Sequence, residues 1–294
     1  MQRLGLVVHP RRELDGALHT IDEWAREHGV GVAQVRTPGS EREVAPPVAP
    51  EDCTLILALG GDGTALAALR AAAPVRRPVL GVACGSLGAL TAVTADDLRD
   101  ALERVAAGDW TQRSLPALVV ETDGGRPLPP SVNDLVVVRR GAGQVSVSVS
   151  VDGELYVRFA GDGAVVATPL GSSAYTLAAG GPVVAPRTMG MVVTPLAPHG
   201  GCCPPLVTGP DSRIELDVEP GYGGARIEGD GQPADELERM ARRCLVVTLR
   251  REHALLVTLG DQEPMLAGLR RRRVIIDSPR LLARADRDAA RPYR

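Results

Sequence analysis

The sequence contains no lysine. Among its 294 residues, the 33 basic ones are all arginines. This absence excludes the lysine on which P-loop NTPases, protein kinases and Schiff-base enzymes depend. A phosphate group bound by this chain must therefore be held by backbone N–H groups, by arginine or through a metal ion.

Aromatic residues are also scarce, with one Phe, two Trp and four Tyr, seven in all. The core must therefore be built from Val, Leu, Ile and Ala. A base-stacking surface for nucleic acid would need more rings than this. The formal net charge is −3 and the one dense basic run is 270–273. Nucleic acid is therefore not an expected partner.

The five cysteines form no CxxC pair, so neither a zinc site nor a disulfide framework is predicted. The first ten residues enter a strand-like run without the charged and apolar regions of a signal peptide. The uncharged stretch 163–186 is interrupted by glycine and proline, which argues against a membrane-spanning helix. We therefore expect a cytoplasmic protein that does not bind a membrane.

The first hundred or so residues alternate apolar strands with helical segments. Strands are predicted at 4–8, 30–35, 53–59 and 78–84, and helices at 13–28, 65–73 and 96–107. Such alternation predicts an α/β domain with a mostly parallel sheet that is covered by helices on both faces.

Beyond Trp110 the pattern changes to strands. Residues 145–151 alternate strictly between Val and Ser, as a half-buried strand does. Further strands are predicted at 115–122, 132–139, 154–159, 191–194, 212–218, 244–250 and 253–259. One helix is predicted at 172–179, and helical texture returns at 264–273. This part of the chain is predicted to be a β-rich domain, a β-sandwich.

The first motif that carries chemistry is Gly60-Gly61-Asp62-Gly63-Thr64, between a predicted strand and a predicted helix. Glycines there let backbone N–H groups approach a phosphate, and the helix N-terminus adds partial positive charge. A carboxylate among such amides is unfavourable unless Asp62 binds Mg²⁺ or accepts a hydroxyl proton. Both exceptions belong to phosphoryl transfer. The alternative is a tight turn in which Asp62 caps the helix.

Two further motifs lie in the β-rich part. Asn133, the only asparagine in the chain, stands beside Asp134, and an amide next to a carboxylate can hold the hydroxyls of a ribose. The alternative for this pair is ordinary turn chemistry. The third motif begins at 161–163 and leads, after one strand, into residues 168–175, where small residues and hydroxyls make room for a ligand. Alone, it predicts no more than a capped helix.

Together, and in this order, the motifs resemble the NAD kinase family along the whole chain. Residues 60–64, the Asn133-Asp134 pair where the family usually has Asn-Glu, residues 168–175 and residues 179–182 fall in register. Asp230-Gly231 fits the family's late Asp-Gly turn. The resemblance implies an α/β domain of residues 1–112, completed by 260–294, and a β-rich dinucleotide-binding domain of residues 113–259.

The activity implied by the resemblance is ATP-dependent phosphorylation of the adenosine 2′-hydroxyl of NAD, with Mg²⁺ or another divalent cation accompanying ATP. Asp62 would orient or deprotonate that hydroxyl. The residues implied for the phosphates of ATP are Gly60, Gly61, Gly63 and Thr64. Those implied for NAD are Asn133, Asp134, Asp162, Thr168, Ser172, Ser173, Ala174 and Tyr175. A homodimer or homotetramer is also implied, whereas metal ligands are not assigned.

The sequence departs from the family's pattern near the substrate. Ala89 stands where the family usually has an aromatic residue, and Pro204 replaces an arginine. These changes support the first of two alternatives, whereas the second is disfavoured by the presence of Asp62, because a pure binder would do better without a carboxylate beside phosphates. The first is a kinase of the same fold that acts on another nucleoside or polyol, and the second is a nucleotide-binding regulator without catalysis.

Overall fold

The computed structural model describes residues 2–39, 41–91, 93–185, 188–260, 265–279 and 281. The chain divides into two compact units, Met1–Gly260 and Asp261–Arg294. Among the described helices, none is long and apolar enough to cross a membrane.

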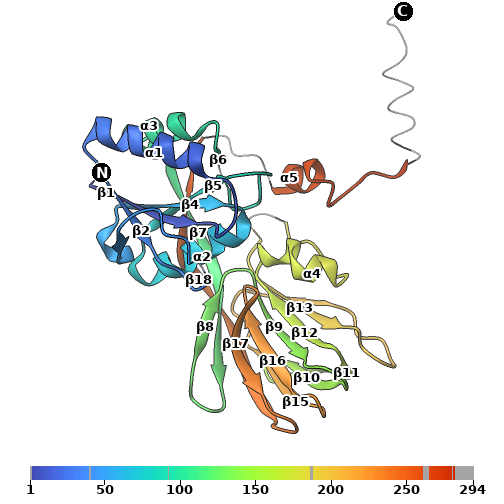
Figure 1. The fold of residues 1–294 in the computed structure, drawn as a ribbon. Helices are drawn as coiled ribbons and strands as arrows, with labels where there is room; N and C mark the ends of the chain where they lie inside the picture. Colours follow the sequence, from blue (N-terminus) through green and yellow to red (C-terminus); the bar gives the residue numbers. More distant parts are fainter. Residues whose placement is uncertain are drawn as a thin grey trace, which may run out of the picture. The chain divides into compact units, whose positions relative to one another are not determined.

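The larger unit begins with a parallel sheet that has helices on both faces (Figure 1). Its strands pair in the order β5-β4-β1-β2-β3, and β6 pairs with β5. These strands are β1 (Arg3–Val8), β2 (Gly31–Val35), β3 (Pro47–Val48), β4 (Leu55–Gly60), β5 (Pro78–Ala83) and β6 (Val93–Thr94). The helices are α1 (Asp15–His28), α2 (Asp62–Ala72) and α3 (Leu98–Ala106), and single 3₁₀ turns lie at Pro50–Asp52 and Ala73–Val75.

The apolar spacing of the helices decides which face each one covers. In α1, Ala17, Ile21 and Trp24 recur at helical intervals and pack with α3 against one face of the sheet. The α1 helix ends at Gly29, whose left-handed φ of 63° suits a glycine. The α2 helix packs on the opposite face through Ala65 and other small apolar residues. This α/β layer is the arrangement that the alternating pattern predicts.

The second part of this unit is a β-sandwich. One sheet has the order β14-β13-β12-β9-β16-β17, and it faces an antiparallel extension of the first sheet. The six strands of the separate sheet are β9 (Asp134–Arg139), β12 (Gly163–Ala167), β13 (Met191–Leu196), β14 (Leu206–Thr208), β16 (Ala225–Gly229) and β17 (Gln232–Leu237). The extension consists of β7 (Thr111–Thr122), β8 (Leu128–Ser131), β10 (Val145–Val151), β11 (Glu154–Gly161), β15 (Ile214–Pro220) and β18 (Arg243–Thr258). The expected fold class is confirmed.

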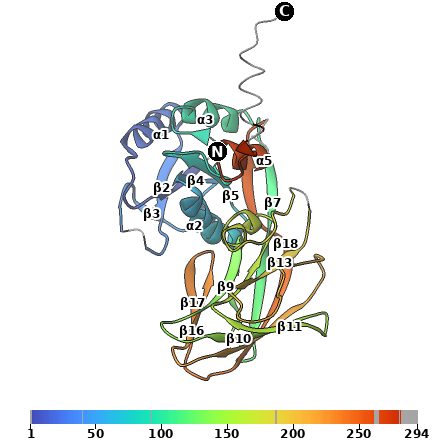
Figure 2. The ribbon, with the colours of Figure 1, turned by 90° about the vertical axis from the view of Figure 1, so that its right-hand side faces the viewer.

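Strand β18 joins the two parts. It pairs parallel with β5 near Leu255 and antiparallel with β15 at its other end, and β7 runs beside it (Figure 2). The prediction of two strands, 244–250 and 253–259, was therefore wrong. The polar residues between them do not form a turn, because the ladder with β7 continues through a register shift between Arg250 and Ala254.

The helix predicted at 172–179 is shorter and broken. A 3₁₀ turn covers Gly171–Ser173, and α4 covers only Tyr175–Ala178. The break lies at Ala174, whose φ of −106° and ψ of −115° are not helical. The chain therefore presents a loop here, held by hydrogen bonds.

The smaller unit contains α5 (Met265–Arg271). Arg270, the first residue of the basic run, forms an ion pair with Asp277 at 2.5 Å. The expectation that residues 260–294 complete the α/β domain stays a prediction.

Candidate active site

The glycine-rich run forms the turn between β4 and α2. Gly60 is the last residue of β4 and Asp62 the first of α2. A Cβ atom on Gly60 would lie 2.2 Å from the hydroxyl oxygen of Thr64, so only glycine fits there. The N–H groups at the start of an α-helix have no carbonyl partner within the helix, and they favour an anion. The turn therefore suits the phosphate role predicted for it.

Asp62 is fixed to the loop that follows β5. Its carboxylate accepts hydrogen bonds from the backbone N–H groups of Ala89 and Leu90, both at 2.9 Å. A Cβ atom on Gly88 would lie only 2.0 Å from Oδ1 of Asp62. The sequence did not reveal this contact, because backbone donors leave no residue-type signal.

A second cluster brings together residues from two distant motifs. Thr168 donates its hydroxyl to the carbonyl of Val132 at 2.7 Å and its N–H to the carbonyl of Asn133 at 2.9 Å. A Cβ atom on Gly171 would lie 2.0 Å from that Asn133 oxygen. The Asn133 turn and the loop 168–175 thus pack tightly against each other.

Asp230 holds the Asn133 turn from the other side. Its carboxylate accepts N–H bonds from Val132 at 3.0 Å, Asn133 at 2.7 Å and Asp134 at 3.3 Å. Asp230 itself has a left-handed φ of 51° at the turn into β17. Its place in the Asp-Gly turn was visible in the sequence, but its clamping role was not.

Asp134 lies buried inside this cluster, with 5% of its surface exposed. Burial, reinforced by the charge of Asp230, raises the pKa of Asp134 to about 7, although the N–H of Tyr175 donates to its carboxylate. Burial also raises the pKa of Asp230. Asp134 is therefore a carboxyl group that can exchange a proton near neutral pH.

Other predicted residues differ in what they offer a ligand. Ser172 is fully buried; it donates to the carbonyl of Pro169 at 2.6 Å and accepts the N–H of Val184 at 2.9 Å. Its hydroxyl is thus committed to the loop. Ala174 and Tyr175 are exposed, and Ser173 is half-buried with its hydroxyl donating to Leu170.

The cluster around Asn133 lies against the helix that starts at Asp62. Val132 and Leu170 pack into the same core cluster as Ala65 and Leu66 of α2. Val132 and Leu170, the neighbours of the two loops, therefore share a core cluster with the first turns of α2.

Asp162 lies apart from these residues. It stands at the opposite end of β12 from Thr168, six residues away, which corresponds to roughly 20 Å along an extended strand. There it forms an ion pair with Arg139. The structure therefore does not bring Asp162 together with the Asn133 cluster.

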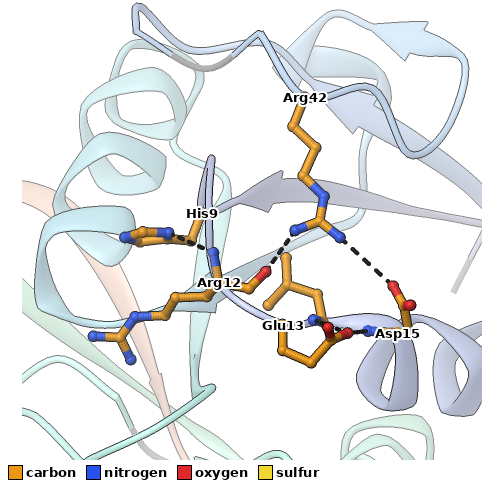
Figure 3. Close-up of polar contacts among 6 residues, drawn as sticks. His9, Arg12, Glu13, Asp15 and Arg42 are labelled. Atoms are coloured by element: carbon orange, nitrogen blue, oxygen red, sulfur yellow. Dashed lines mark hydrogen bonds and ion pairs between the residues drawn. The ribbon is translucent and has the colours of Figure 1, made fainter.

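The loop after β1 also reaches the glycine-rich turn, although the sequence indicated no role for it. His9 accepts N–H bonds from Arg11 and Arg12 through Nδ1, both at 3.1 Å. Arg42 donates to the carbonyl of Arg12 at 2.6 Å and pairs with Asp15 at 3.6 Å (Figure 3). Burial and the neighbouring arginines lower the pKa of His9, which keeps Nδ1 an acceptor.

The two residues that depart from the family pattern, Ala89 and Pro204, each form a hydrogen bond through a backbone group. Ala89 contributes its backbone N–H to Asp62, a contact that any residue except proline can make. The carbonyl of Pro204 accepts the Tyr156 hydroxyl at 2.8 Å.

Comparisons with known proteins agree with the family resemblance that the sequence motifs indicate. The model of the ATP-NAD kinase N-terminal domain matches residues 3–110, and that of the C-terminal domain matches residues 124–258. An NAD kinase of Chlorobium luteolum is 32% identical over 269 residues, 88% of this chain and 92% of that protein. One of Koribacter versatilis is 35% identical over 81% of this chain and 87% of that protein.

A further NAD kinase, of Heliobacterium modesticaldum, is 38% identical over 187 residues, 62% of this chain and 66% of that protein. Among solved structures, yeast NADH kinase complexed with NADH has a TM-score of 0.79 at 21% identity, covering 96% of this chain and 90% of that one. The Archaeoglobus fulgidus NAD kinase in complex with ATP has a TM-score of 0.72 at 24% identity, covering 92% and 99%. The chain belongs to the NAD kinase family.

Proposed function

We propose that the chain transfers a phosphoryl group from ATP to the adenosine 2′-hydroxyl of NAD, giving NADP, with Asp62 at the reacting centre. The relatives that span most of the chain are named NAD kinases. They favour this reaction over phosphorylation of another nucleoside or polyol, and over a regulator without catalysis.

The observation that carries the proposal is the fixed position of the Asp62 carboxylate at the glycine-rich turn. Its two oxygens accept backbone N–H groups from Ala89 and Leu90, which hold the carboxylate in one orientation beside the phosphate-binding turn. Orienting the 2′-hydroxyl and accepting its proton as the phosphoryl group transfers is a task for a positioned base.

For the donor, we propose that Gly60, Gly61, Gly63 and Thr64 hold the phosphates through backbone N–H groups. Within the described ranges, no three His, Cys, Asp or Glu side chains gather as a metal site. Asp62 is the carboxylate that stands in the glycine-rich turn. These residues do not fit a resident metal, so the divalent cation is proposed to arrive with ATP as part of the substrate.

For NAD, we propose that the Asn133 cluster binds the adenosine end. The side-chain oxygen Oδ1 of Asn133 is buried without a hydrogen-bond partner among the described residues. Leaving a buried acceptor unpaired is costly, and a ligand donor would satisfy it. Asp134, Thr168 and Ser172 support this position from inside, and Ser173, Ala174 and Tyr175 border it.

Several further properties belong to the proposal. We propose that Asp162 contacts a remote part of the dinucleotide, since it lies at the far end of β12. Residues 1–112, completed by 260–294, are proposed as the α/β nucleotide-binding domain, and 113–259 as the β-rich dinucleotide-binding domain. A cytoplasmic homodimer or homotetramer that binds neither nucleic acid nor membrane is the proposed form.

Replacing Asp62 with Asn tests the proposal. The amide keeps the size and one of the two acceptor oxygens but is a far weaker base, so we expect a loss of about 10²- to 10⁴-fold in kcat with a normal fold. NADP formation from ATP, Mg²⁺ and NAD is measured, with circular dichroism as the folding control. Near-native turnover by D62N would contradict the role of Asp62. Phosphorylation of other nucleosides but not of NAD would contradict the substrate.

A further inference from the structure

One arginine outside the predicted motifs lies directly on the glycine-rich turn. A Cβ atom on Gly61 would lie 3.5 Å from Nη2 of Arg12, and one on Gly85 would lie 2.4 Å from Nη1. Gly61 follows β4 and Gly85 follows β5, two neighbouring parallel strands. The Arg12 guanidinium therefore lies where the carboxyl ends of these strands meet, beside the turn that carries Asp62.

The loop after β1 holds this guanidinium in place. Nη1 of Arg12 donates to the carbonyl of Cys84 at 2.7 Å. The backbone of Arg12 is fixed at both ends, by the His9 ring that accepts its N–H and by Arg42, which donates to its carbonyl (Figure 3). A side chain ordered before binding loses less entropy when a ligand arrives.

The charge of Arg12 has no carboxylate partner in the part of the chain that the structure describes, since no ion pair within 4.0 Å involves it. Its neighbour Arg42, by contrast, pairs with Asp15. A guanidinium carries five N–H donors, and the bond to Cys84 uses one of them. The others are available to an anion with oxygen acceptors in a planar arrangement.

We propose that Arg12 binds the phosphate groups of ATP and supplies, in a chain without lysine, the cation that offsets their charge next to Asp62. The inference rests on the proposed function, because the anion is identified as the donor nucleotide at the glycine-rich turn. Arg12 thus becomes a substrate-binding residue for ATP and not for NAD.

The test compares Arg12→Gln with Arg11→Gln, which removes the same charge from the adjacent, exposed arginine. Steady-state rates give the KM for ATP and for NAD, and calorimetry gives the Kd of a non-hydrolysable ATP analogue. We expect R12Q to raise the KM for ATP and the analogue Kd by about 10-fold or more, as loss of a charged hydrogen bond does. The KM for NAD should stay within about twofold, and R11Q should behave like wild type.

Arg12→Lys separates binding from packing. Lysine restores a cation but lacks the planar fork, so we expect ATP affinity between those of wild type and R12Q. Should R12Q fail to fold, Arg12→Met, which keeps the aliphatic length but removes the charge, decides in its place, and wild-type affinity for the analogue in R12M would overturn the inference. An R12Q variant with unchanged ATP affinity, or with equal losses for ATP and NAD, would also overturn it.

The two proposals fail in distinguishable ways. If the wild type binds the analogue but makes no NADP, the proposed function fails. The role of Arg12 is then tested only by comparing the Kd of the analogue between the wild type and the Arg12 variants. If the wild type makes NADP and R12Q retains its ATP affinity, only the inference about Arg12 fails.

Discussion

Asp134 is a carboxyl group whose ionisation the fold opposes. Burial and the nearby charge of Asp230 raise its pKa from 3.8 to about 7. The folded chain therefore keeps a proton that the unfolded chain releases near pH 4. The stability that this proton contributes is complete below about pH 4 and is lost as the pH rises through about 7.

Asp134→Asn should remove this dependence, because the amide stays neutral at every pH. We expect the free energy of unfolding of the variant, relative to wild type, to rise by up to a few kcal/mol between about pH 4 and about pH 8. Urea titrations at a series of pH values measure it. A constant difference across that range would show that Asp134 is not the titrating group.

At the scale of residues, the sequence predicted the candidate catalytic and binding residues better than the residues that position them through hydrogen bonds. Asp62 and Asn133 stand out because a carboxylate among glycines and a lone asparagine are chemically unusual. The Ala89 amide and the clamping role of Asp230 gave no such signal. Both act on backbone groups, and their partners are distant in the sequence.

At the scale of elements, the turn after β4 and the loop after β5 contact each other through the Asp62 carboxylate. Gly88 approaches the Asp62 carboxylate so closely that a Cβ atom would lie 2.4 Å from its Cγ. The position of the carboxylate therefore depends on the path of a different loop. The lack of a side chain at Gly88, in the loop after β5, thus allows the Asp62 carboxylate at the start of α2 to take its position.

Gly88→Ala should displace the Asp62 carboxylate without unfolding the chain. A shift of about 1 Å at a reacting group can cost on the order of 10²-fold in rate, so we expect kcat to fall by roughly that factor. The matched control is Gly16→Ala in α1, where a Cβ atom meets nothing within 4 Å. Rates and thermal melting of both variants are compared. Wild-type kcat in G88A would show that the contact does not position Asp62.

Element boundaries were predictable where period and local chemistry agreed. The Val-Ser alternation of β10 matches its burial, and α1 ends at His28, the end of the predicted helix 13–28. The polar stretch inside β18 was misleading, because a long partner strand keeps the ladder running where local sequence suggests a turn. Helix α4 is short because tertiary hydrogen bonds of the Thr168 and Ser172 hydroxyls override helical propensity.

At the scale of the whole molecule, the predicted aliphatic core is present. Among the described residues, Trp24 is the one aromatic side chain buried completely, and Leu, Ile, Val and Ala form the rest of the buried cluster around it. The sandwich core is also mainly aliphatic, with Phe159 and Met191 as its other members. Composition alone could predict this. It could not predict that β7 and β18 extend from one core into the other.

Because those strands are shared, we expect the two cores to unfold together. Leu57→Ala in the α/β core and Leu245→Ala in the sandwich core each remove a fully buried side chain, at a cost of about 2–5 kcal/mol. Trp24 fluorescence, in a Trp110→Phe background, and far-UV circular dichroism follow unfolding in denaturant. Both variants should shift both signals to the same midpoint. If L245A moved only the dichroism signal, the cores would be independent.

The continuity of β7 and β18 also constrains how related genes can be recombined. A chimera that took residues 3–110 from one parent and 124–258 from another would set β5 of the first beside β18 of the second. If β7 were omitted, the antiparallel ladder of β18 would be left as an open edge, prone to association with other chains. A working chimera of this fold should therefore take β5, β7 and β18 from the same parent, even though these strands lie far apart in the sequence.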